Sequence, residues 1–275
     1  MGLRKAIQRI PWLTAPARQV LGVLRRAGAA ITGKSTSVSA KYRKLGGDDI
    51  ALEATRLRSS WRDEALPARQ RALVDRQLDA YRGGDAVDVF DVYVDALRDI
   101  ESRIPDASLL EIGCSSGYYS EVMAIAGSRV AYTGCDYSEA LIRLARVRHP
   151  GIRFDIEDAT QLSYPDKSFD IVVSGCCLLH IPEYQTAIAE TARVARSSVI
   201  FHRTPVLENG PTEFFRKEAY GVETFEIHFS EQELLKLFLQ NGLIVERRID
   251  LTREALPSGV VTAVRTYVCR MNGIA

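Results

Sequence analysis

A short turn between a predicted strand and a predicted helix carries the first residues that could do chemistry. The sequence LLEIGCSSGYYSEV (residues 109–122) places Glu111 just before a turn that contains Gly113 and Gly117. Glycine permits a tight turn and lets the backbone approach a ligand closely. The G-x-x-x-G spacing differs from the G-x-G-x-x-G of dinucleotide-binding loops, and the Glu111 carboxylate would repel two phosphates. This turn therefore favours a cationic or zwitterionic ligand.

The residues that follow the next apolar runs could bind a nucleoside. Asp136 ends the second run, where a carboxylate can accept hydrogen bonds from both hydroxyls of a ribose. Tyr137 beside it offers an aromatic face to a purine. The third run leads to Asp158 and Ala159, where a side-chain acceptor could take an adenine amino group, and the fourth ends near Ser174 on the opposite wall.

These residues need a scaffold that brings several strand ends together, and the middle of the chain predicts one. The apolar runs that predict strands are 108–113, 129–135, 151–157, 169–175 and 197–202. Segments with helical spacing separate them at 117–126, 138–148 and 183–195. Strands that alternate with helices of this length form βαβ crossovers and a parallel sheet. Ligands bind such sheets beyond the carboxyl ends of the strands.

The C-terminal part of the chain predicts one more helix and two more strands. Ser230 and Glu233 have the spacing of a capping box, and Gly242 marks the end of the helix that they begin. The last strand, TAVRTYVCR (262–270), follows a short loop and should pair antiparallel with the strand before it. We therefore expect an α/β fold with a doubly wound, mostly parallel seven-stranded sheet and a C-terminal antiparallel strand, preceded by an N-terminal helical extension.

The ordered series of motifs resembles the class I S-adenosylmethionine-dependent methyltransferases, which have a Rossmann-like fold. The matching pieces are LLEIGCSSG, YTGCDYS, IEDATQLSYPDKSFDIVVS, LLHIPEYQTAIAETARV and FSEQELLKLFLQNGLIV, and the likeness covers roughly residues 105–270. Two departures are visible. Ser115 stands where the first motif commonly has a middle glycine, and ARSSVIF replaces the usual Pro-Gly turn before the fifth strand.

The resemblance implies that S-adenosyl-L-methionine is the cofactor and assigns contacts with it to particular residues. The cofactor-binding residues that it implies are Glu111, Gly113, Ser115 and Gly117 around the methionine part, Asp136 at the ribose, Tyr137 at the adenine face, Asp158 and Ala159 at the adenine edge, and Ser174 at the methionyl end. No metal site is expected, because the cysteines and histidines do not cluster with the spacing of metal ligands.

A hydroxyl acceptor of the methyl group would also need a base. His180, just after the fourth predicted strand, is the best-placed candidate, and His202, which ends the fifth, is the second. His149 lies in a turn far from the expected site, and His228 precedes the last helix. The segment 202–230 contains prolines and glycines and is interpreted as a long loop that, with helices from 48–100, covers the acceptor pocket.

The N-terminal region differs in charge from the rest of the chain. Residues 1–47 hold ten Lys or Arg and no Asp or Glu, whereas residues 48–275 hold 26 basic and 35 acidic side chains. Such a basic, partly amphipathic arm could lie on an anionic membrane surface, pack on the acidic body of the protein or imitate an organelle transit peptide. Within it, Gly28–Ser35 spells the phosphate-binding pattern G-x-x-x-x-G-K-S, but no buried strand precedes it and no helix-forming segment follows. We interpret it as a basic linker.

The sequence therefore divides into a basic arm (1–47), a helical cap (48–104) and a methyltransferase domain (105–275). The five cysteines form no C-x-x-C pair and are expected to be free thiols in a cytoplasmic protein. No apolar stretch is long enough to span a bilayer, although the arm could place the protein at a membrane surface. The acidic body disfavours nucleic acid as a partner.

The methyl acceptor is expected to be a small molecule or a sugar-like or lipid-linked hydroxyl, and its identity and the oligomeric state stay open. Two other functions remain at this point. One is a protein that binds S-adenosylmethionine without turnover, for which Ser115 is the hint. The other is a membrane-surface scaffold that acts through its basic arm.

Overall fold

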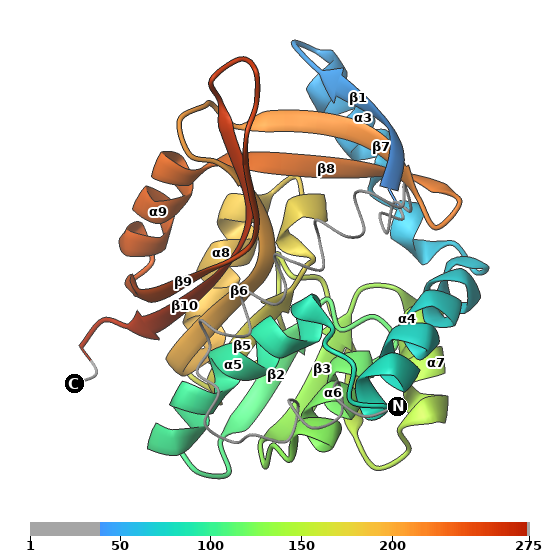
Figure 1. The fold of residues 1–275 in the computed structure, drawn as a ribbon, viewed down its shortest axis with the longest axis vertical. Helices are drawn as coiled ribbons and strands as arrows, with labels where there is room; N and C mark the ends of the chain where they lie inside the picture. The colour runs from blue at the N-terminus through green and yellow to red at the C-terminus, as the bar shows by residue number, and fades with distance from the viewer. Residues whose placement is uncertain (1–38, 274–275) are drawn as a thin grey trace, which may run out of the picture.

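Seven strands form a central sheet in the order β4-β3-β2-β5-β6-β10-β9 (Figure 1). The computed structural model describes residues 39–273. The strands of this sheet are β2 (Ser108–Ile112), β3 (Ala131–Asp136), β4 (Arg153–Ile156), β5 (Phe169–Gly175), β6 (Ala195–Leu207), β9 (Leu243–Ala255) and β10 (Val261–Met271). The first five pair in parallel, and β10 runs antiparallel to both β6 and β9. This confirms the predicted doubly wound sheet with its C-terminal antiparallel strand.

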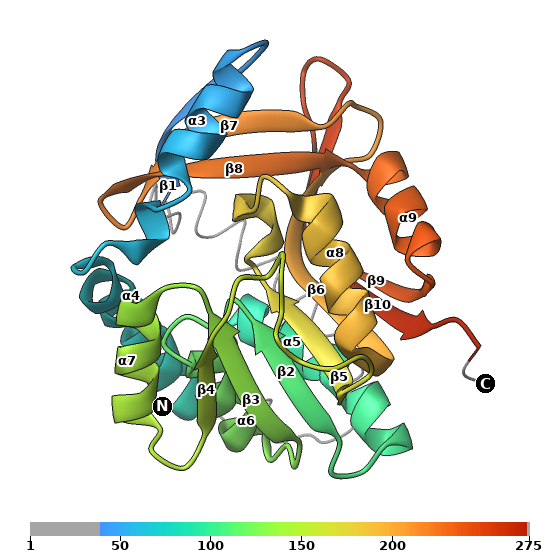
Figure 2. The ribbon, with the colours of Figure 1, turned by 180° about the vertical axis from the view of Figure 1, so that it is seen from behind.

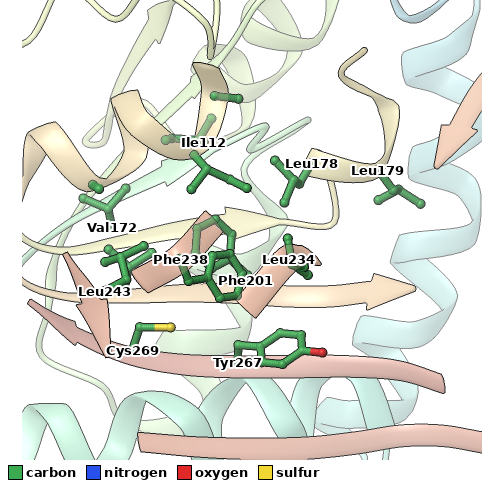
Figure 3. Close-up of a cluster of buried hydrophobic side chains, with 14 of the residues drawn as sticks. Ile112, Val172, Leu178, Leu179, Phe201, Leu234, Phe238, Leu243, Tyr267 and Cys269 are labelled. Carbon is green, nitrogen blue, oxygen red and sulfur yellow. The ribbon is translucent and has the colours of Figure 1, made fainter. Parts of the chain in front are cut away.

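Helices cover both faces of the central sheet. They are α5 (Asp88–Arg103), α6 (Tyr118–Ala126), α7 (Glu139–Arg148), α8 (Tyr184–Val194) and α9 (Glu231–Gln240). Neighbouring residues of a strand point to opposite faces, so Leu109 and Ile171 pack with α5 and α6, whereas Leu110 and Val172 pack with α8 and α9. Figure 2 shows α8 in front of the sheet and α5 behind it. Figure 3 shows the second cluster, in which Val172 lies among side chains of β6, α9 and β10.

A second, smaller sheet lies beyond the carboxyl ends of the central strands. It consists of β1 (Ser39–Leu45), β7 (Glu213–Ala219) and β8 (Val222–Ser230), paired antiparallel in that order. We call these three strands the upper sheet. It joins the central sheet where Val206 and Leu207 of β6 pair with the end of β8. Figure 1 shows β7 and β8 crossing above the central strands.

The upper sheet shows that the interpretation of 202–230 as a long loop was wrong. Strand β6 continues to Leu207, and β7 and β8 form a hairpin with a two-residue turn at Tyr220 and Gly221. Both turn residues have positive φ, 51° and 78°, as a type I′ hairpin turn requires. The strand pattern in the sequence is the alternation of Phe225, Ile227 and Phe229, all of which are buried.

The residues before the central sheet form the predicted helices. They are α3 (Asp49–Leu57), the short 3-10 helix η1 (Ser60–Arg62) and α4 (Leu66–Arg82), followed by α5. Helix α5 packs directly on the central sheet, because its buried residues share a cluster with β2, β5 and β6. Helix α3 contacts β8, and α4 contacts α6 and α7. This arrangement places α3, η1 and α4 around the end of the sheet where the strands terminate (Figure 1).

The capping box predicted at the start of α9 does not form. Ser230 makes no side-chain capping bond. Instead its backbone N–H donates to Thr212 Oγ1 (3.0 Å), and the Thr212 hydroxyl donates to Glu233 (2.7 Å). Thr212 lies just before β7. A residue beside the upper sheet therefore bonds both Ser230 and Glu233, which were expected to bond each other.

Several predictions for the N-terminal region fall on residues outside the described range. These are Gly28–Ser35 and the basic arm up to residue 38; only its last residues form part of β1. All five cysteines lie in the described range and are free, as predicted. Among residues 39–273, no helix is long and apolar enough to cross a membrane.

Candidate functional site

A cavity of about 370 Å³ opens at the carboxyl ends of β2, β3, β5 and β6. The remaining walls come from η1, α4, the upper sheet and the short 3-10 helix η2 (Leu178–His180). The predicted site residues that line the cavity are Gly113, Ser115, Asp136, Tyr137, Asp158, Ala159 and His180. Those that lie outside its lining are Glu111, Gly117, Ser174 and His202. The topology therefore brings most of the predicted residues into one space.

The turn after β2 has a backbone that only glycine accommodates at two positions. Gly113 has φ 72°, and a Cβ there would come within 2.7 Å of Cys177 Sγ. Gly117 has φ 73°, and a Cβ there would meet the Phe154 ring at 2.6 Å. Ser115 between them also has positive φ, 54°, and its hydroxyl donates to Gln70 of α4. The serine that replaces the family's middle glycine thus ties the turn to α4.

Asp136 anchors the turn after β2 to the end of β3. Its two carboxylate oxygens accept the backbone N–H groups of Ser115 and Ser138, each at 3.0 Å. Burial raises the pKa of Asp136 to about 6, although the backbone hydrogen bonds lower it. Each carboxylate oxygen has a second lone pair, so the group can still accept bonds from a ligand in the cavity. A pair of ribose hydroxyls is the ligand group that fits this acceptor.

The side chains predicted to contact adenine already have partners from η1 and the residues beside it. The Tyr137 hydroxyl donates to the Arg58 carbonyl (2.7 Å), and the Arg62 guanidinium lies 4.9 Å from the Tyr137 ring centroid. Asp158 accepts bonds from Thr160 and, at 3.3 Å, from the Arg58 side chain. Burial alone would raise the pKa of Asp158, but these bonds outweigh it and hold the pKa below its usual value. Helix η1 thus closes this end of the cavity.

Glu111 and Ser174 are buried behind the cavity. The Tyr132 hydroxyl donates to Glu111, which is 1% exposed. Burial raises the pKa of Glu111 to about 8, a shift that the Tyr132 bond reduces and the charge of Asp136 increases. Glu111 is therefore neutral at pH 7. The Ser174 hydroxyl lies 3.2 Å from Cys177 Sγ, and Cys177 itself reaches the cavity.

The two candidate bases occupy different surroundings. His180 lines the cavity, and its ring lies 4.6 Å from the ring of Trp61. Its Nδ1 lies 2.7 Å from the Phe225 carbonyl; because a carbonyl only accepts, Nδ1 carries the proton and Nε2 is the free acceptor. Burial, with the nearby charge of Lys217, lowers the pKa of His180 to about 3. A neutral His180 is therefore an acceptor of hydrogen bonds at every physiological pH.

His202 is enclosed in the protein interior. Its Nδ1 lies 2.9 Å from Thr266 Oγ1 and its Nε2 lies 2.9 Å from the Tyr119 hydroxyl. Burial lowers the pKa of His202. Both ring nitrogens are thus engaged away from the cavity. Of the other two histidines, His149 lies beside Gly117, outside the cavity lining, and His228 lies in the upper sheet.

Charged and aromatic residues that were not among those predicted from the sequence form the far end of the cavity. Lys217 forms a buried ion pair with Glu226 across β7 and β8. Arg203, one residue past His202, also lines the cavity, as does Trp61. Tyr220 joins them from the hairpin turn. The sequence held two signals for these residues, charged residues at alternate positions of a strand and a Tyr-Gly turn. They were not recognised because residues 202–230 were interpreted as a loop.

Comparisons with known proteins find a match for the part of the chain that carries the glycine turn and Asp136. Residues 110–202 match the family model described as a methyltransferase domain. A probable S-adenosylmethionine-dependent methyltransferase of Mycolicibacterium smegmatis is 31% identical over 99 residues, which span 36% of this chain and 38% of that protein. A phthiotriol/phenolphthiotriol dimycocerosates methyltransferase of Mycobacterium tuberculosis is 33% identical over 95 residues, which span 34% of this chain and 35% of that one. The alignments thus span well under half of each relative's length.

A solved structure agrees with these matches at the level of the fold. The S-adenosylmethionine-dependent methyltransferase from Clostridium acetobutylicum aligns with a TM-score of 0.51 and 12% sequence identity, over 72% of this chain and 98% of that one. The family model matches the part of the chain that runs from within β2 to within β6 and includes the glycine turn. Together these findings confirm the resemblance that the ordered motifs indicate.

Proposed function

We propose, on the premise that residues 110–202 are a class I S-adenosylmethionine-dependent methyltransferase domain, that this chain transfers a methyl group from its cofactor to a small-molecule acceptor. The observation that carries the proposal is the meeting of the glycine turn and Asp136 at one end of a cavity whose other end is polar. We propose that the cofactor lies at the first end and the acceptor at the second, with their reacting atoms between the two ends.

The residues of the turn and of β3 are proposed to hold the cofactor. Asp136 would accept bonds from the ribose hydroxyls, and the backbone at Gly113 and Ser115 would face the methionine part. Tyr137 and Ala159 would border the adenine. Bound there, S-adenosylmethionine supplies a sulfonium-activated methyl group, so the protein's own contribution is mainly alignment, which can supply roughly 7–11 kcal/mol.

His180 is proposed as the residue that receives the acceptor hydroxyl. Its Nε2 is the free acceptor, because Nδ1 donates to the Phe225 carbonyl, and Trp61 packs against the ring. A hydroxyl bonded to Nε2 would pass its proton to that nitrogen as its oxygen takes the methyl group in an in-line displacement, with S-adenosylhomocysteine as the leaving group. His202 has both nitrogens engaged in the interior, so the proposal of a base rests on His180.

Calorimetry of the full-length protein with S-adenosylmethionine tests the proposed cofactor site. We expect micromolar binding that weakens at least about tenfold in Asp136→Asn and Asp136→Ala, since a charge-assisted acceptor is lost. Asp166→Ala is the matched control, because Asp166 is exposed and pairs with Arg193. ATP should not bind. Absence of S-adenosylmethionine binding by the wild type would overturn the proposal.

A further proposal concerns the basic arm and the division of the chain into arm (1–47), cap (48–104) and catalytic domain (105–275). The ten basic and no acidic residues of the arm are suited to hold a cytoplasmic protein at an anionic membrane surface. We expect the full chain to sediment with phosphatidylserine vesicles. A chain without residues 1–38 should stay in solution and still bind S-adenosylmethionine; equal sedimentation of both chains would contradict the proposal.

A further inference from the structure

We propose that the methyl acceptor carries a carboxylate and that Arg203 binds it at the end of the cavity opposite to Asp136. This inference rests on the proposed function, because it names the class of acceptor for the same cavity. Arg203 follows the parallel part of β6 and lines the cavity together with Cys176, Tyr118 and Tyr220.

Within the described residues, Arg203 differs from Arg58 and Lys217, the other cations of the cavity, because no carboxylate pairs with it. Arg58 pairs with Asp158 and Glu183, and Lys217 pairs with Glu226. Among residues 39–273, no ion pair or side-chain hydrogen bond engages the Arg203 guanidinium. The neighbouring side chains that raise its pKa are those of Cys176, which has the largest effect, Tyr119, Tyr118 and Tyr220. A guanidinium that is largely shielded from water and lacks a partner is costly. An anionic ligand in the cavity would remove this cost.

The backbone around Arg203 gives a second, independent observation. Arg203 (φ 58°) and Cys176 (φ 62°) are non-glycine residues in the left-handed region that both line the cavity, and Arg203 lies at the register shift between β6 and β10. Each such conformation costs of order 1–3 kcal/mol and persists where the surrounding structure enforces it, often at ligand sites. The two residues come from β6 and from the end of β5, so they meet in space and not in sequence.

The charges around Arg203 select a singly charged anion. Lys217 neutralises Glu226, whose oxygens also receive bonds from Tyr42 and His228. The end near Arg203 therefore keeps one positive charge, which matches one carboxylate. A phosphate carries about 1.5 to 2 negative charges at pH 7 and would leave an excess of negative charge beside Glu226.

The other end of the cavity carries more carboxylates than cations. Arg58 lines it and pairs with Asp158 and Glu183, and Asp136 and Glu157 line it as well. An acceptor held by Arg203 therefore points its carboxylate away from the cofactor end and its nucleophilic atom toward it. The guanidinium fork matches the planar geometry of a carboxylate and fixes its orientation through two hydrogen bonds.

The carboxylate of the cofactor itself is the competing ligand for Arg203. The strand order β3-β2-β5-β6 separates Arg203 from the glycine turn after β2 by two strand spacings, roughly 10 Å. The end of β5, with Cys176 and Cys177, lies between them. We therefore assign Arg203 to the acceptor, and the experiment below distinguishes the two ligands.

Cys176 provides a reporter beside Arg203 that does not require the acceptor to be identified. Iodoacetate and iodoacetamide alkylate thiols in the same way but differ in charge, so the ratio of their rates at Cys176 reports carboxylate binding. Any effect of Arg203 on the reactivity of the thiol itself enters both rates and cancels in this ratio. Tandem mass spectrometry of the full-length protein separates Cys176 from Cys177.

We expect the ratio of the iodoacetate rate to the iodoacetamide rate at Cys176 to fall about tenfold in Arg203→Gln, because a charge-assisted hydrogen bond to the carboxylate is lost. Arg203→Lys keeps the charge and should retain most of the preference. Arg143→Gln is the control, because Arg143 is exposed and pairs with Glu64. An unchanged ratio in a folded Arg203→Gln protein overturns the inference.

Calorimetry with S-adenosylhomocysteine separates this inference from the proposed function. We expect Arg203→Gln to change the affinity for it by less than about threefold, since the lost charge-assisted bond serves another ligand. A loss of tenfold or more would mean that Arg203 holds the cofactor's carboxylate and would overturn the inference. If the wild type does not bind S-adenosylhomocysteine at all, the proposed methyl transfer fails, and the alkylation ratio alone decides whether Arg203 is a carboxylate site.

Discussion

At the scale of single residues, Glu111 is a carboxyl group that the fold keeps protonated. Its folded pKa is about 8, raised by burial from an ordinary value of 4.5. Between these two pH values the folded protein holds a proton that the unfolded chain releases, so stability falls as pH rises, by up to about 1.4 kcal/mol per pH unit. Below pH 4.5 and above about pH 8, the ionisation of Glu111 no longer makes the stability depend on pH.

Replacing Glu111 by glutamine should remove that dependence. We expect the thermal midpoint of Glu111→Gln to fall less than that of the wild type between pH 5.5 and pH 7.5, because the amide cannot release a proton. Calorimetric unfolding across this range provides the measurement. Parallel midpoints for the two proteins would show that Glu111 is already ionised in the fold.

The turn after β2 gives a prediction for a backbone position. Gly113→Ala would place a methyl group against Cys177 and force a left-handed backbone on alanine. We expect destabilisation by about 2–4 kcal/mol and loss of cofactor binding. Gly151→Ala is the matched control, since a Cβ there meets nothing within 4 Å and its φ is not positive. Urea unfolding and calorimetry measure both effects, and equal stability of the two variants would contradict the geometry.

Residue by residue, the sequence located the glycine turn and Asp136 in the cavity but not the end near Arg203. The position of the turn and of Asp136 depends on strand order and on local turn geometry, both of which leave sequence patterns. Arg203 could not be found in this way, because the pattern drew attention to His202. The pairing of β6 with β10 shifts register at these two residues, and Arg203 has positive φ (58°), so the strand is bulged where His202 enters the interior and Arg203 lines the cavity.

At the scale of elements, the upper sheet was the part that sequence reasoning missed. The βαβ alternation can be predicted from the sequence, because each strand and each helix shows its own hydrophobic period. The upper sheet instead depends on pairing between β1 and β7, whose paired residues lie more than 160 positions apart. Pro205 and Gly210 suggested a loop, yet Pro205 lies within β6, paired with Val264.

The attachment of β1 to β7 allows a test of what holds the upper sheet together. Lys41 and Lys44 form exposed ion pairs with Glu218 and Glu213, whereas Leu45 is buried in the core. Exposed pairs contribute at most about 1 kcal/mol, but truncating a buried leucine costs about 2–5 kcal/mol.

We therefore expect Leu45→Ala to increase amide hydrogen exchange throughout β1 and to lower the free energy of unfolding by at least about 2 kcal/mol. Lys41→Ala should leave both measurements almost unchanged. If the lysine variant loosened β1 as much as the leucine variant, the ion pairs and not the core contact would hold the strand.

At the scale of the whole molecule, a charged network joins the helical cap to the central sheet. Arg71 of α4, 4% exposed, donates to Asp75 and to Glu121 of α6. Arg82 also binds Glu121, and Arg148 of α7 binds Asp75. The same helix carries Gln70, which accepts the Ser115 hydroxyl of the glycine turn. Helix α4 therefore connects the position of the cap to the geometry of the glycine turn after β2.

Arg71→Met should weaken the connection between the helical cap and the glycine turn. Loss of the Arg71 bonds should cost about 1.5–3 kcal/mol, the contribution of hydrogen bonds to charged groups, because Glu121 keeps Arg82 and Asp75 keeps Arg148 as partners. We expect faster hydrogen exchange along α4 and weaker S-adenosylmethionine binding, although Arg71 does not line the cavity. Arg76→Met, on the exposed side of the same helix, is the control for the loss of a positive charge. If Arg71→Met loosens α4 and cofactor affinity stays unchanged, the glycine turn keeps its geometry without the cap, and Gln70 contributes nothing to it.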